Sequence, residues 1–283
     1  MKPSRAISLL WRAEIGALLR SPQGILGGCV FLIAAGWALS KLGGNADLFN
    51  RISAGGLNPE ESVFLAVVKW LAGNDAEYIQ RLIVERSPFL SIFFIVTVFT
   101  VPFAAMIFSL DQNASDIGNR GIRFYLFRAR RAELFWGRWL GNTILFGAMC
   151  LAAAAAATVV ALMLDERHGA LEIVATGAWA WAALWLAAVP WISLMALCGN
   201  LTGNPLLAAT LGFGSYLGVV LIGGFGGWMF ESLKVLRYLL PAPLRYQLLT
   251  GNAADAMFAA AATLGYAAVF SSAAYFVLRR RDL

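Results

Sequence analysis

Six long apolar stretches constrain the fold of this 283-residue chain more than any other feature. A helix rises about 1.5 Å per residue, so about 20 apolar residues are needed to cross the roughly 30 Å hydrocarbon core of a bilayer. The stretches that reach this length are residues 24–42, 89–110, 136–164, 171–198, 206–228 and 256–278. The sequence therefore predicts an all-α polytopic membrane protein with six transmembrane helices.

The composition excludes an ordinary soluble domain. Hydrophobic residues make up 60% of the chain and charged residues only 13%, which is too little charge to cover a soluble surface. Cys29, Cys150 and Cys198 all lie inside apolar stretches, so neither a disulfide framework nor a zinc site is predicted. The distribution of the net charge of +6 indicates a membrane-orientation signal and no nucleic-acid partner.

The basic residues predict the orientation of the chain, because segments rich in Lys and Arg stay in the cytoplasm. One alternating set of segments comprises the N-terminal arm, the connection 111–138, the turn 199–205 and the C-terminal tail. This set carries thirteen basic residues and five acidic ones, whereas the opposite set carries nine basic and eleven acidic residues. We therefore expect both termini on the cytoplasmic side of the cell (inner) membrane.

Three segments outside the spans have patterns of their own. Residues 1–22 predict an amphipathic helix in the cytoplasmic interface, in contact with membrane lipids, with an ordinary packed helix as the alternative. Residues 23–283 then form a single membrane domain, in which residues 44–88 are expected to make a structured outer loop that caps the helices. Residues 229–254, divided by Pro241 and Pro243, are too charged to span and too apolar for a solvated loop. They predict a re-entrant helical hairpin on the outer side before the last span.

Several kinds of chemistry are absent from the sequence. It contains no phosphate-binding loop, no His-Glu-x-x-His zinc motif and only one histidine, His168. No catalytic residue, metal site or cofactor is predicted, which disfavours a membrane-embedded enzyme. The spans also contain almost no ionisable residue at mid-depth, whereas ion-coupled transporters usually need one. Energy for transport would then come from a separate polypeptide that binds on the cytoplasmic side.

The connection 111–138 is the segment best suited to receive such a partner. It mixes acidic and basic residues with an apolar run at 122–127, which a simple charged anchor would not need. This pattern predicts a short helix that ends at a glycine, followed by an amphipathic segment that presents a docking site to a soluble protein. A basic belt that only contacts the membrane surface is the alternative.

This connection resembles the intracellular loop of ABC-2 type permeases, the membrane subunits of type V ATP-binding cassette (ABC) exporters. The features that carry the resemblance are Asp116, Arg120-Gly121, the apolar run 122–127, the basic patch 128–131 and Gly137-Arg138. The departures are Asp116 in place of glutamate, no proline before Arg130-Arg131, and Arg138 in place of lysine. The opening residues 11–21, the broken segment before the last span and the ending 279–283 are also similar to those of the family.

The resemblance implies a half-transporter without a nucleotide-binding domain of its own. Such permeases form a homodimer, or a heterodimer, and each copy binds a cytoplasmic ABC ATPase that holds ATP and Mg²⁺, so no cofactor is expected on this chain. A coupling helix near residues 112–120 and a smaller contact at the turn 199–205 would touch the ATPase. The residues expected at the coupling surface are Gln112, Asp116, Arg120, Gly121, Arg123, Arg130 and Arg131, and those at the second contact are Asn200, Thr202 and Asn204.

The fifth apolar stretch is rich in glycine. Gly214 with Gly218, and Gly223 with Gly227, have the spacing that lets helix backbones approach closely. In the family this helix lines the dimer interface and the pathway, and we expect the same here; close packing within one subunit is the alternative. The expected function is ATP-driven export of an amphiphilic substrate. The alternative is a scaffold or maturation subunit of the same fold that transmits force to an extracytoplasmic partner.

Overall fold

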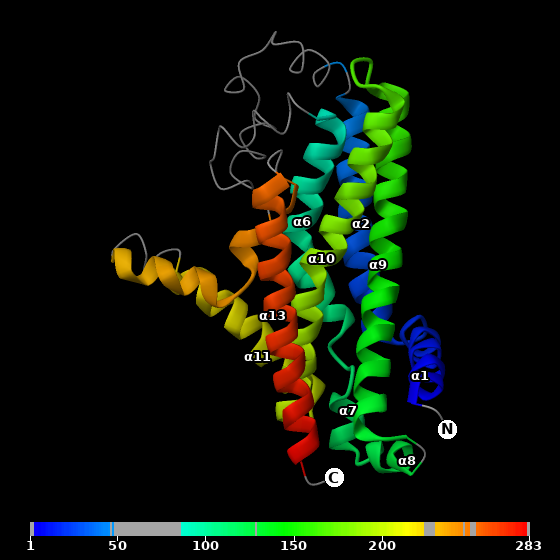
Figure 1. Cartoon of the computed structure of the whole chain (residues 1–283), viewed down its shortest axis with the longest axis vertical. Coiled ribbons are helices and arrows are strands. Elements are labelled where there is room, and N and C mark those ends of the chain that lie inside the picture. The colour runs from blue at the N-terminus through cyan, green and yellow to red at the C-terminus, as the bar shows by residue number, and fades with distance from the viewer. Residues whose placement is uncertain are drawn as a thin grey trace.

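The computed structural model describes residues 3–45, 47, 86–127, 129–223, 230–245, 247–249 and 253–281. These residues form α-helices and short 3-10 helices and contain no β-strand (Figure 1). Within them, five helices are long and apolar enough to cross a membrane. They are α2 (Pro22–Gly44), α6 (Pro88–Phe108), α9 (Arg131–Leu164), α10 (Ala170–Thr202) and α13 (Ala253–Arg280). The prediction of an all-α, multi-pass membrane protein is confirmed, whereas the predicted outer cap at 44–88 lies almost wholly outside the described residues.

Proline and short polar side chains set the starts of two helices. The Ser21 hydroxyl caps α2 by accepting a hydrogen bond from the Gly24 N–H at 3.0 Å, and a proline occupies the first turn. The Asn204 side chain caps α11 (Pro205–Leu221) in the same way by accepting from the Leu206 N–H at 2.9 Å. Gly203 ends α10 with a φ of 66°, which suits a glycine. The turn between α10 and α11 is therefore short and well defined.

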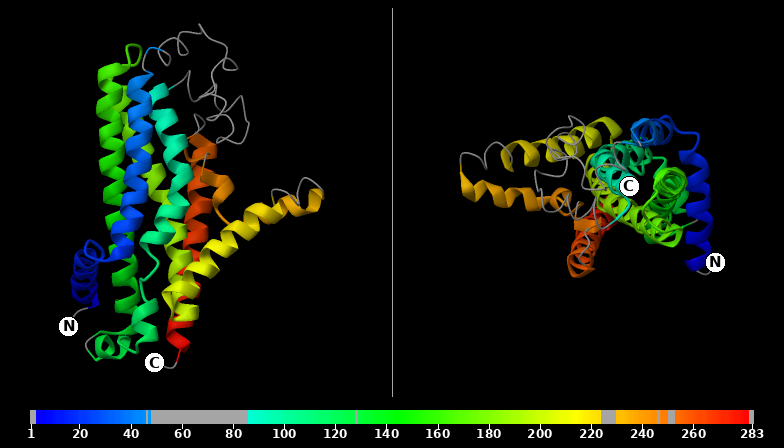
Figure 2. Two further views of the ribbon diagram at one scale, coloured as in Figure 1. Left: turned by 180° about the vertical axis from the view of Figure 1, so that it is seen from behind. Right: turned by 90° about the horizontal axis from the view of Figure 1, so that it is seen from above.

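A single helix covers only part of the predicted span at 206–228. α11 has 17 residues and would extend about 25 Å at about 1.5 Å per residue, less than the roughly 30 Å hydrocarbon core. It leans away from the other long helices, whose axes run side by side (Figures 1 and 2). Residues 222–223 add a π-helical turn, and 224–229 lie outside the described residues. The part of the chain that the structure describes thus accounts for five of the six predicted crossings by length.

The segment predicted as a re-entrant hairpin, 229–254, contains short 3-10 helices instead of one regular hairpin. These are η2 (Glu231–Leu239), η3 (Ala242–Arg245) and η4 (Gln247–Leu249). η2 returns beside α11, and the two form an arm that projects from the bundle (Figure 2). The Arg237 Nε–H joins the two limbs by donating to the Gly223 carbonyl at 2.7 Å. The hairpin is thus made by η2 with α11, because Pro241 and Pro243 interrupt the chain after η2.

α6 and α10 form the centre of the bundle. Phe89, Phe93 and Phe94 of α6 are at most 1% exposed, and α6 packs between α2 and α10. α10 also packs against α9 and α13. Two indole N–H groups of α10 have partners on α9: Trp181 donates to the Gly147 carbonyl at 3.0 Å and Trp185 to the Thr143 carbonyl at 2.9 Å. These tryptophans therefore serve packing, with their polar atoms satisfied.

α1 (Pro3–Leu18) lies across the axis of the bundle against α9 (Figure 2). The two helices approach closely because α9 has glycines at the contact. A Cβ on Gly137 would lie 2.6 Å from Leu10 Cβ, and one on Gly141 would lie 2.8 Å from Glu14 Cβ. Leu9, on another side of α1, is 54% exposed. α1 is therefore a packed helix that also keeps an outward apolar surface, which combines features of the two alternatives.

The segments predicted to share one side of the membrane lie together at one end of the bundle. α1, α7 (Ala114–Gly118), α8 (Ile122–Leu126) and the end of α13 all lie at this end (Figure 1). The turn between α9 and α10, at residues 165–169, lies at the opposite end (Figure 1). We call the first of these the basic end.

Candidate functional site

The connection between α6 and α9 folds into two short helices at the basic end. The Asp111 carboxylate accepts a hydrogen bond from the Ser115 N–H at 2.8 Å, next to the start of α7. Arg120, with a φ of 57°, and Gly121 form the corner between α7 and α8. The coupling helix predicted near 112–120 thus corresponds to α7, which has five residues.

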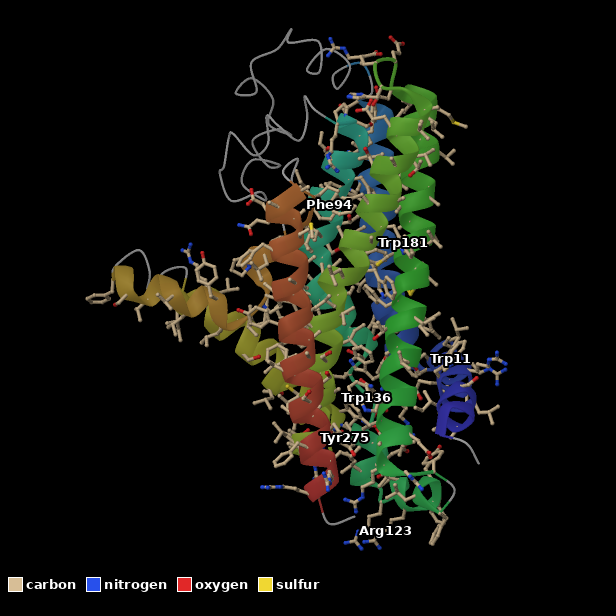
Figure 3. The ribbon with its side chains drawn as sticks, viewed as in Figure 1. Trp11, Phe94, Arg123, Trp136, Trp181 and Tyr275 are labelled. Atoms are coloured by element: carbon tan, nitrogen blue, oxygen red, sulfur yellow. The ribbon has the colours of Figure 1, made fainter. Side chains whose placement is uncertain are left out.

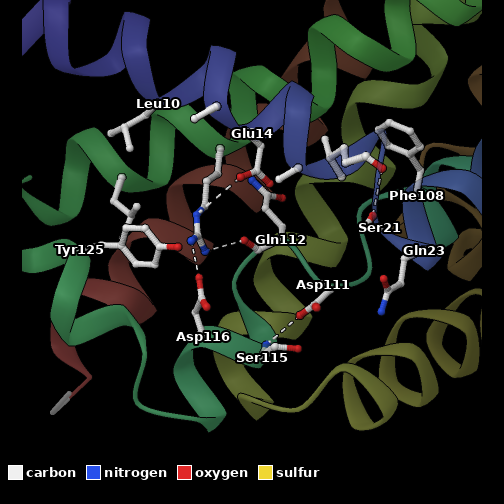
Figure 4. Close-up of a pocket in the computed structure, with 15 residues that line it drawn as sticks. Leu10, Glu14, Ser21, Gln23, Phe108, Asp111, Gln112, Ser115, Asp116 and Tyr125 are labelled. Carbon is white, nitrogen blue, oxygen red and sulfur yellow. Dashed lines mark hydrogen bonds and ion pairs between the residues drawn. The ribbon is translucent and has the colours of Figure 1, made fainter.

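Arg138 of α9 is the centre of a buried polar cluster that holds this connection. Its guanidinium, in a residue only 8% exposed, pairs with Asp116 of α7 and lies 3.7 Å from a Glu14 carboxylate oxygen of α1 (Figure 4). It also donates to the Gln112 carbonyl at 2.9 Å and to Asn113 Oδ1 at 3.1 Å. The ring of Tyr125 in α8 lies 5.0 Å from the guanidinium carbon. One side chain therefore ties α1, α7 and α8 to a long helix of the bundle.

Within this cluster, Glu14 has a carboxyl group with a raised pKa. Its side chain is 15% exposed, and burial raises the pKa of its carboxyl to about 7. Arg138 and a hydrogen bond from Asn142 act in the opposite direction, whereas the carboxylates of Asp116 and Asp111 raise the pKa further. Near neutral pH this carboxyl group is therefore present in both protonation states.

α7 is also in contact with the turn between α10 and α11, the predicted second contact. A Cβ on Gly118 would clash with the Gly203 carbonyl oxygen, and one on Gly203 would lie 2.9 Å from Ile117 Cγ2. The structure therefore brings the two predicted cytoplasmic contacts together. A displacement of α7 cannot occur without affecting this turn, because the two backbones touch.

The side chains of the predicted second contact mostly serve the turn itself. Asn200 is fully buried, and its amide donates to the Ala274 carbonyl of α13 at 2.9 Å. The Thr202 hydroxyl donates to the Asn204 carbonyl at 3.1 Å. Asn204 caps α11 and is exposed. Asn200 thus supports this surface from within and is not available to a partner in this conformation.

An arginine-lined hollow of about 260 Å³ lies between α7, α8 and the turn. Arg120 and Arg123 are exposed beside it, and Arg281 reaches it from the end of α13. Arg281 also donates to the Asn200 carbonyl. The lining contains no acidic residue among those described, and its members are Ile117, Gly118, Arg120, Ile122, Arg123, Thr202, Gly203 and Arg281. Such a hollow attracts a carboxylate or a phosphate.

The remaining predicted coupling residues differ in accessibility. Gln112 is 3% exposed, and Asp116 is engaged by Arg138. Arg131 is directed at the last turn of α13, where one guanidinium nitrogen lies 2.7 Å from the Arg279 carbonyl oxygen. This bond satisfies a carbonyl that has no partner within the helix. Arg130 is exposed, so the accessible part of the predicted surface consists of Arg120, Arg123 and Arg130.

Two aromatic side chains of this connection point outward. Phe124 is 76% exposed and Phe127 is 85% exposed. They lie close in sequence to Arg123, which Figure 3 shows at the tip of the bundle. Exposed aromatic residues beside arginines are typical of surfaces that bind another protein or a membrane interface. They fit the predicted docking segment.

Sequence reasoning missed Glu14, Arg138 and Arg281 as members of the site. A signal for Glu14 was present, because Leu10, Glu14 and Leu18 are spaced four residues apart and share one helical face. An acidic residue within an apolar stripe indicates a buried partner of opposite charge. Nothing in the sequence indicated which of the many arginines this partner would be.

The glycines of the predicted dimer helix lie in two environments. A Cβ on Gly214 or Gly218 would meet no atom of the described residues within 4 Å. A Cβ on Gly223 would instead lie 2.7 Å from Arg237 Cγ of η2. Gly227 lies outside the described residues.

No protein-family model matches this chain, and no curated protein matches it. The geometry of the basic end and of α11 therefore carries the functional interpretation.

Proposed function

We propose that the chain is the membrane permease subunit of an ATP-driven exporter of the ABC-2 type. A separate cytoplasmic ATPase, which holds ATP and Mg²⁺, binds at α7 and α8 and drives the movement of an amphiphilic substrate. The observation that carries this proposal is the anchoring of α7. It is tied to α1 and α9 through Arg138 and touches the turn between α10 and α11.

The basic end faces the cytoplasm of the cell (inner) membrane in this proposal. The support is its excess of basic residues, since short loops rich in Lys and Arg remain in the cytoplasm. α10 ends at the basic end and α13 begins toward the opposite end, so the chain must cross between them, and we assign this sixth crossing to α11 and the arm that it forms with η2 (Figure 1). With six crossings, both termini face the cytoplasm.

The ATPase contacts the exposed part of the α7–α8 connection. Arg120 and Arg123 offer positive charge beside the arginine-lined hollow, which suits an acidic side chain of the partner. Phe124 and Phe127 offer apolar contact area next to it. A charged pocket with neighbouring aromatic anchors is a favourable arrangement for a specific protein contact.

Force applied to α7 reaches α1, α9, α10 and α11 through short, direct contacts. The Asp116–Arg138 pair transmits it to α9, and the Glu14–Arg138 pair transmits it to α1. The contact of α7 with Gly203 transmits it to α10 and α11. α11 leans away from the bundle and has an open glycine face, which suits a helix that meets a second copy and moves during transport.

Charge reversal at the exposed arginines tests the proposal. The chain is purified from its native membrane together with the ABC ATPase that we expect to bind it, both are reconstituted in vesicles, and ATPase binding and ATP hydrolysis are measured. We expect Arg120→Glu with Arg123→Glu to weaken binding by about tenfold or more, because two attractive contacts become repulsive. Arg167→Glu, an exposed arginine at the opposite end, is the matched control and leaves binding unchanged. Full binding by the double variant would refute the docking assignment.

A further inference from the structure

A pocket of about 270 Å³ lies between α1, the end of α6, α7 and α9 (Figure 4). One wall is apolar and is formed by Leu10, Ala13, Ala17, Leu18 and Phe108. The other wall is polar and comes mainly from the connection 111–116. The pocket is thus amphiphilic, and its apolar wall includes the helix that lies across the bundle axis, where a membrane surface would run.

The polar wall carries more negative than positive charge. Glu14, Asp111 and Asp116 all line the pocket, and Arg138 is the only basic residue among its lining residues. Arg138 is already engaged by Asp116, by Glu14 and by two oxygen atoms of the connection. Glu14 and Asp116 share the Arg138 guanidinium, and Asp111 adds a third carboxylate to the lining, so among the described residues the acidic side chains outnumber the basic ones. Such an excess of negative charge is unfavourable in a partly buried site. Burial is the main cause of the raised pKa of Glu14, and the Asp116 and Asp111 carboxylates add to it.

Gln112 provides a second and independent sign of a missing ligand. It is 3% exposed and lines the pocket, yet neither its amide oxygen nor its amide nitrogen has a hydrogen-bond partner among the described residues. Buried polar groups are normally satisfied, so an amide with both atoms unsatisfied indicates a place where another polar group binds. A ligand that donates hydrogen bonds and carries positive charge would satisfy both Gln112 and the carboxylates.

We propose that this pocket binds the primary ammonium group of an amphiphile, such as a lipid with an ethanolamine headgroup. An ammonium group carries the positive charge that the polar wall lacks, and its N–H groups can donate to carboxylates of that wall and to the Gln112 amide oxygen. The apolar part of the ligand lies along Leu10 and Leu18 of α1. This inference does not depend on the ATPase, because it needs only the contact of α1 with a membrane.

Other ligands fit the pocket less well. An anion would be repelled by the excess of carboxylates. A metal ion has little support, since the described residues hold no group of three or more Asp, Glu, His or Cys placed to bind one. A choline headgroup carries charge but has no N–H to donate to Gln112. A lysine of a protein partner has the right charge, but the apolar wall formed by α1 and α6 favours a membrane amphiphile.

Lipid competition measured by native mass spectrometry tests the proposal on the full-length protein. The purified chain is offered equal amounts of phosphatidylethanolamine, phosphatidylcholine and phosphatidylglycerol, and retained lipid is counted. We expect phosphatidylethanolamine to be retained about tenfold better than phosphatidylcholine, because only the former can donate hydrogen bonds to the buried acceptors. Asp111→Asn and Gln112→Leu should each remove most of this preference. The matched control, Glu172→Gln, changes an exposed carboxylate at the opposite end and keeps the preference.

Further experiments distinguish a lipid headgroup from a free amine as the source of the ammonium group. They also identify the results that would overturn the proposal. Competition by free ethanolamine or by an apolar amine would show that the ammonium group itself is recognised and supports the proposal for either source. Thermal unfolding of each variant identifies any that fails to fold, in which case Asp111→Asn alone decides. Equal retention of all three lipids, or an unchanged preference in the folded variants, overturns the proposal. If none of the three lipids is retained and the pocket is occupied only when an ATPase is bound, the pocket would belong to a lysine of that partner, and the proposal would be overturned as well.

Discussion

The α7–α8 region is anchored within the chain, whereas the α11–η2 arm projects from the bundle, although the sequence predicts that both regions contact partners. In the first region, polar groups of α1, α7 and α9 meet at Arg138, so the short helices are anchored within one chain. In the second, Gly214 and Gly218 face open space, and Val235 of η2 is 69% exposed. The first region can therefore receive force as a folded unit, whereas the arm has an apolar surface that lipid or a second copy must cover.

The largest change in the free energy of unfolding is expected when Arg138, which anchors α7, is replaced. Arg138→Ala removes the guanidinium and leaves the largely buried Glu14 carboxylate and the partly exposed Asp116 carboxylate without a counterion. Removing one partner of a buried ion pair typically costs about 3 to 5 kcal/mol. We expect a loss of stability of that size, measured by thermal or denaturant unfolding in detergent.

Arg123→Ala is the matched control for this change. Arg123 belongs to the same connection but is exposed, so its loss should alter the free energy of unfolding by no more than about 0.5 kcal/mol. Similar unfolding midpoints for the two variants would mean that the Arg138 cluster does not anchor α7, and the difference between the two regions would disappear.

A second prediction concerns the pH dependence of the anchored region. Burial raises the pKa of Glu14 from its ordinary value of 4.5 to about 7. Between these values the folded protein keeps a proton that the unfolded chain has released. The free energy of unfolding therefore falls as pH rises through this window, by on the order of 2 to 3 kcal/mol, and the loss is complete above pH ~7.

Glu14→Gln should abolish this dependence, because the amide has no proton to release. The variant should match the parent near pH ~5 and exceed its stability near pH ~8. Unfolding curves for both proteins across this range give the two slopes. Parallel slopes would show that Glu14 has an ordinary pKa in the folded state, and that the pocket does not lack positive charge.

The sequence predicted the helices well because their causes are local. A run of about 20 apolar residues needs no knowledge of the rest of the chain to be recognised as a span. The pairing of Arg138 with Glu14 could not be predicted, because helical periodicity gives the face of a residue but not the helix that it meets.

Two other differences between the prediction and the fold also arise from contacts between distant segments. Gln112 lies in a connection that the sequence presents as a docking surface, yet the fold turns its amide inward. The stretch 206–228 was expected as a glycine-rich span at a dimer interface, and α11 covers only part of it and joins η2 through Arg237. Both outcomes depend on contacts between segments distant in the chain, which composition and spacing do not record.

The smallest change in stability is expected for substitutions at the exposed glycines of α11, which test whether this helix meets a second copy or lipid. Gly214→Leu and Gly218→Leu place side chains into open space, so the single chain should change in stability by no more than about 0.5 to 1 kcal/mol, with any gain due to higher helix propensity. Gly212→Leu on the same helix is the matched control, because a Cβ there already meets Met195 Sδ, and it should destabilise the fold.

If α11 forms the contact with a second copy, Gly214→Leu and Gly218→Leu reduce the dimer fraction measured by light scattering while the unfolding midpoint stays constant. A dimer fraction that is unchanged in both would instead assign the glycine face to lipid.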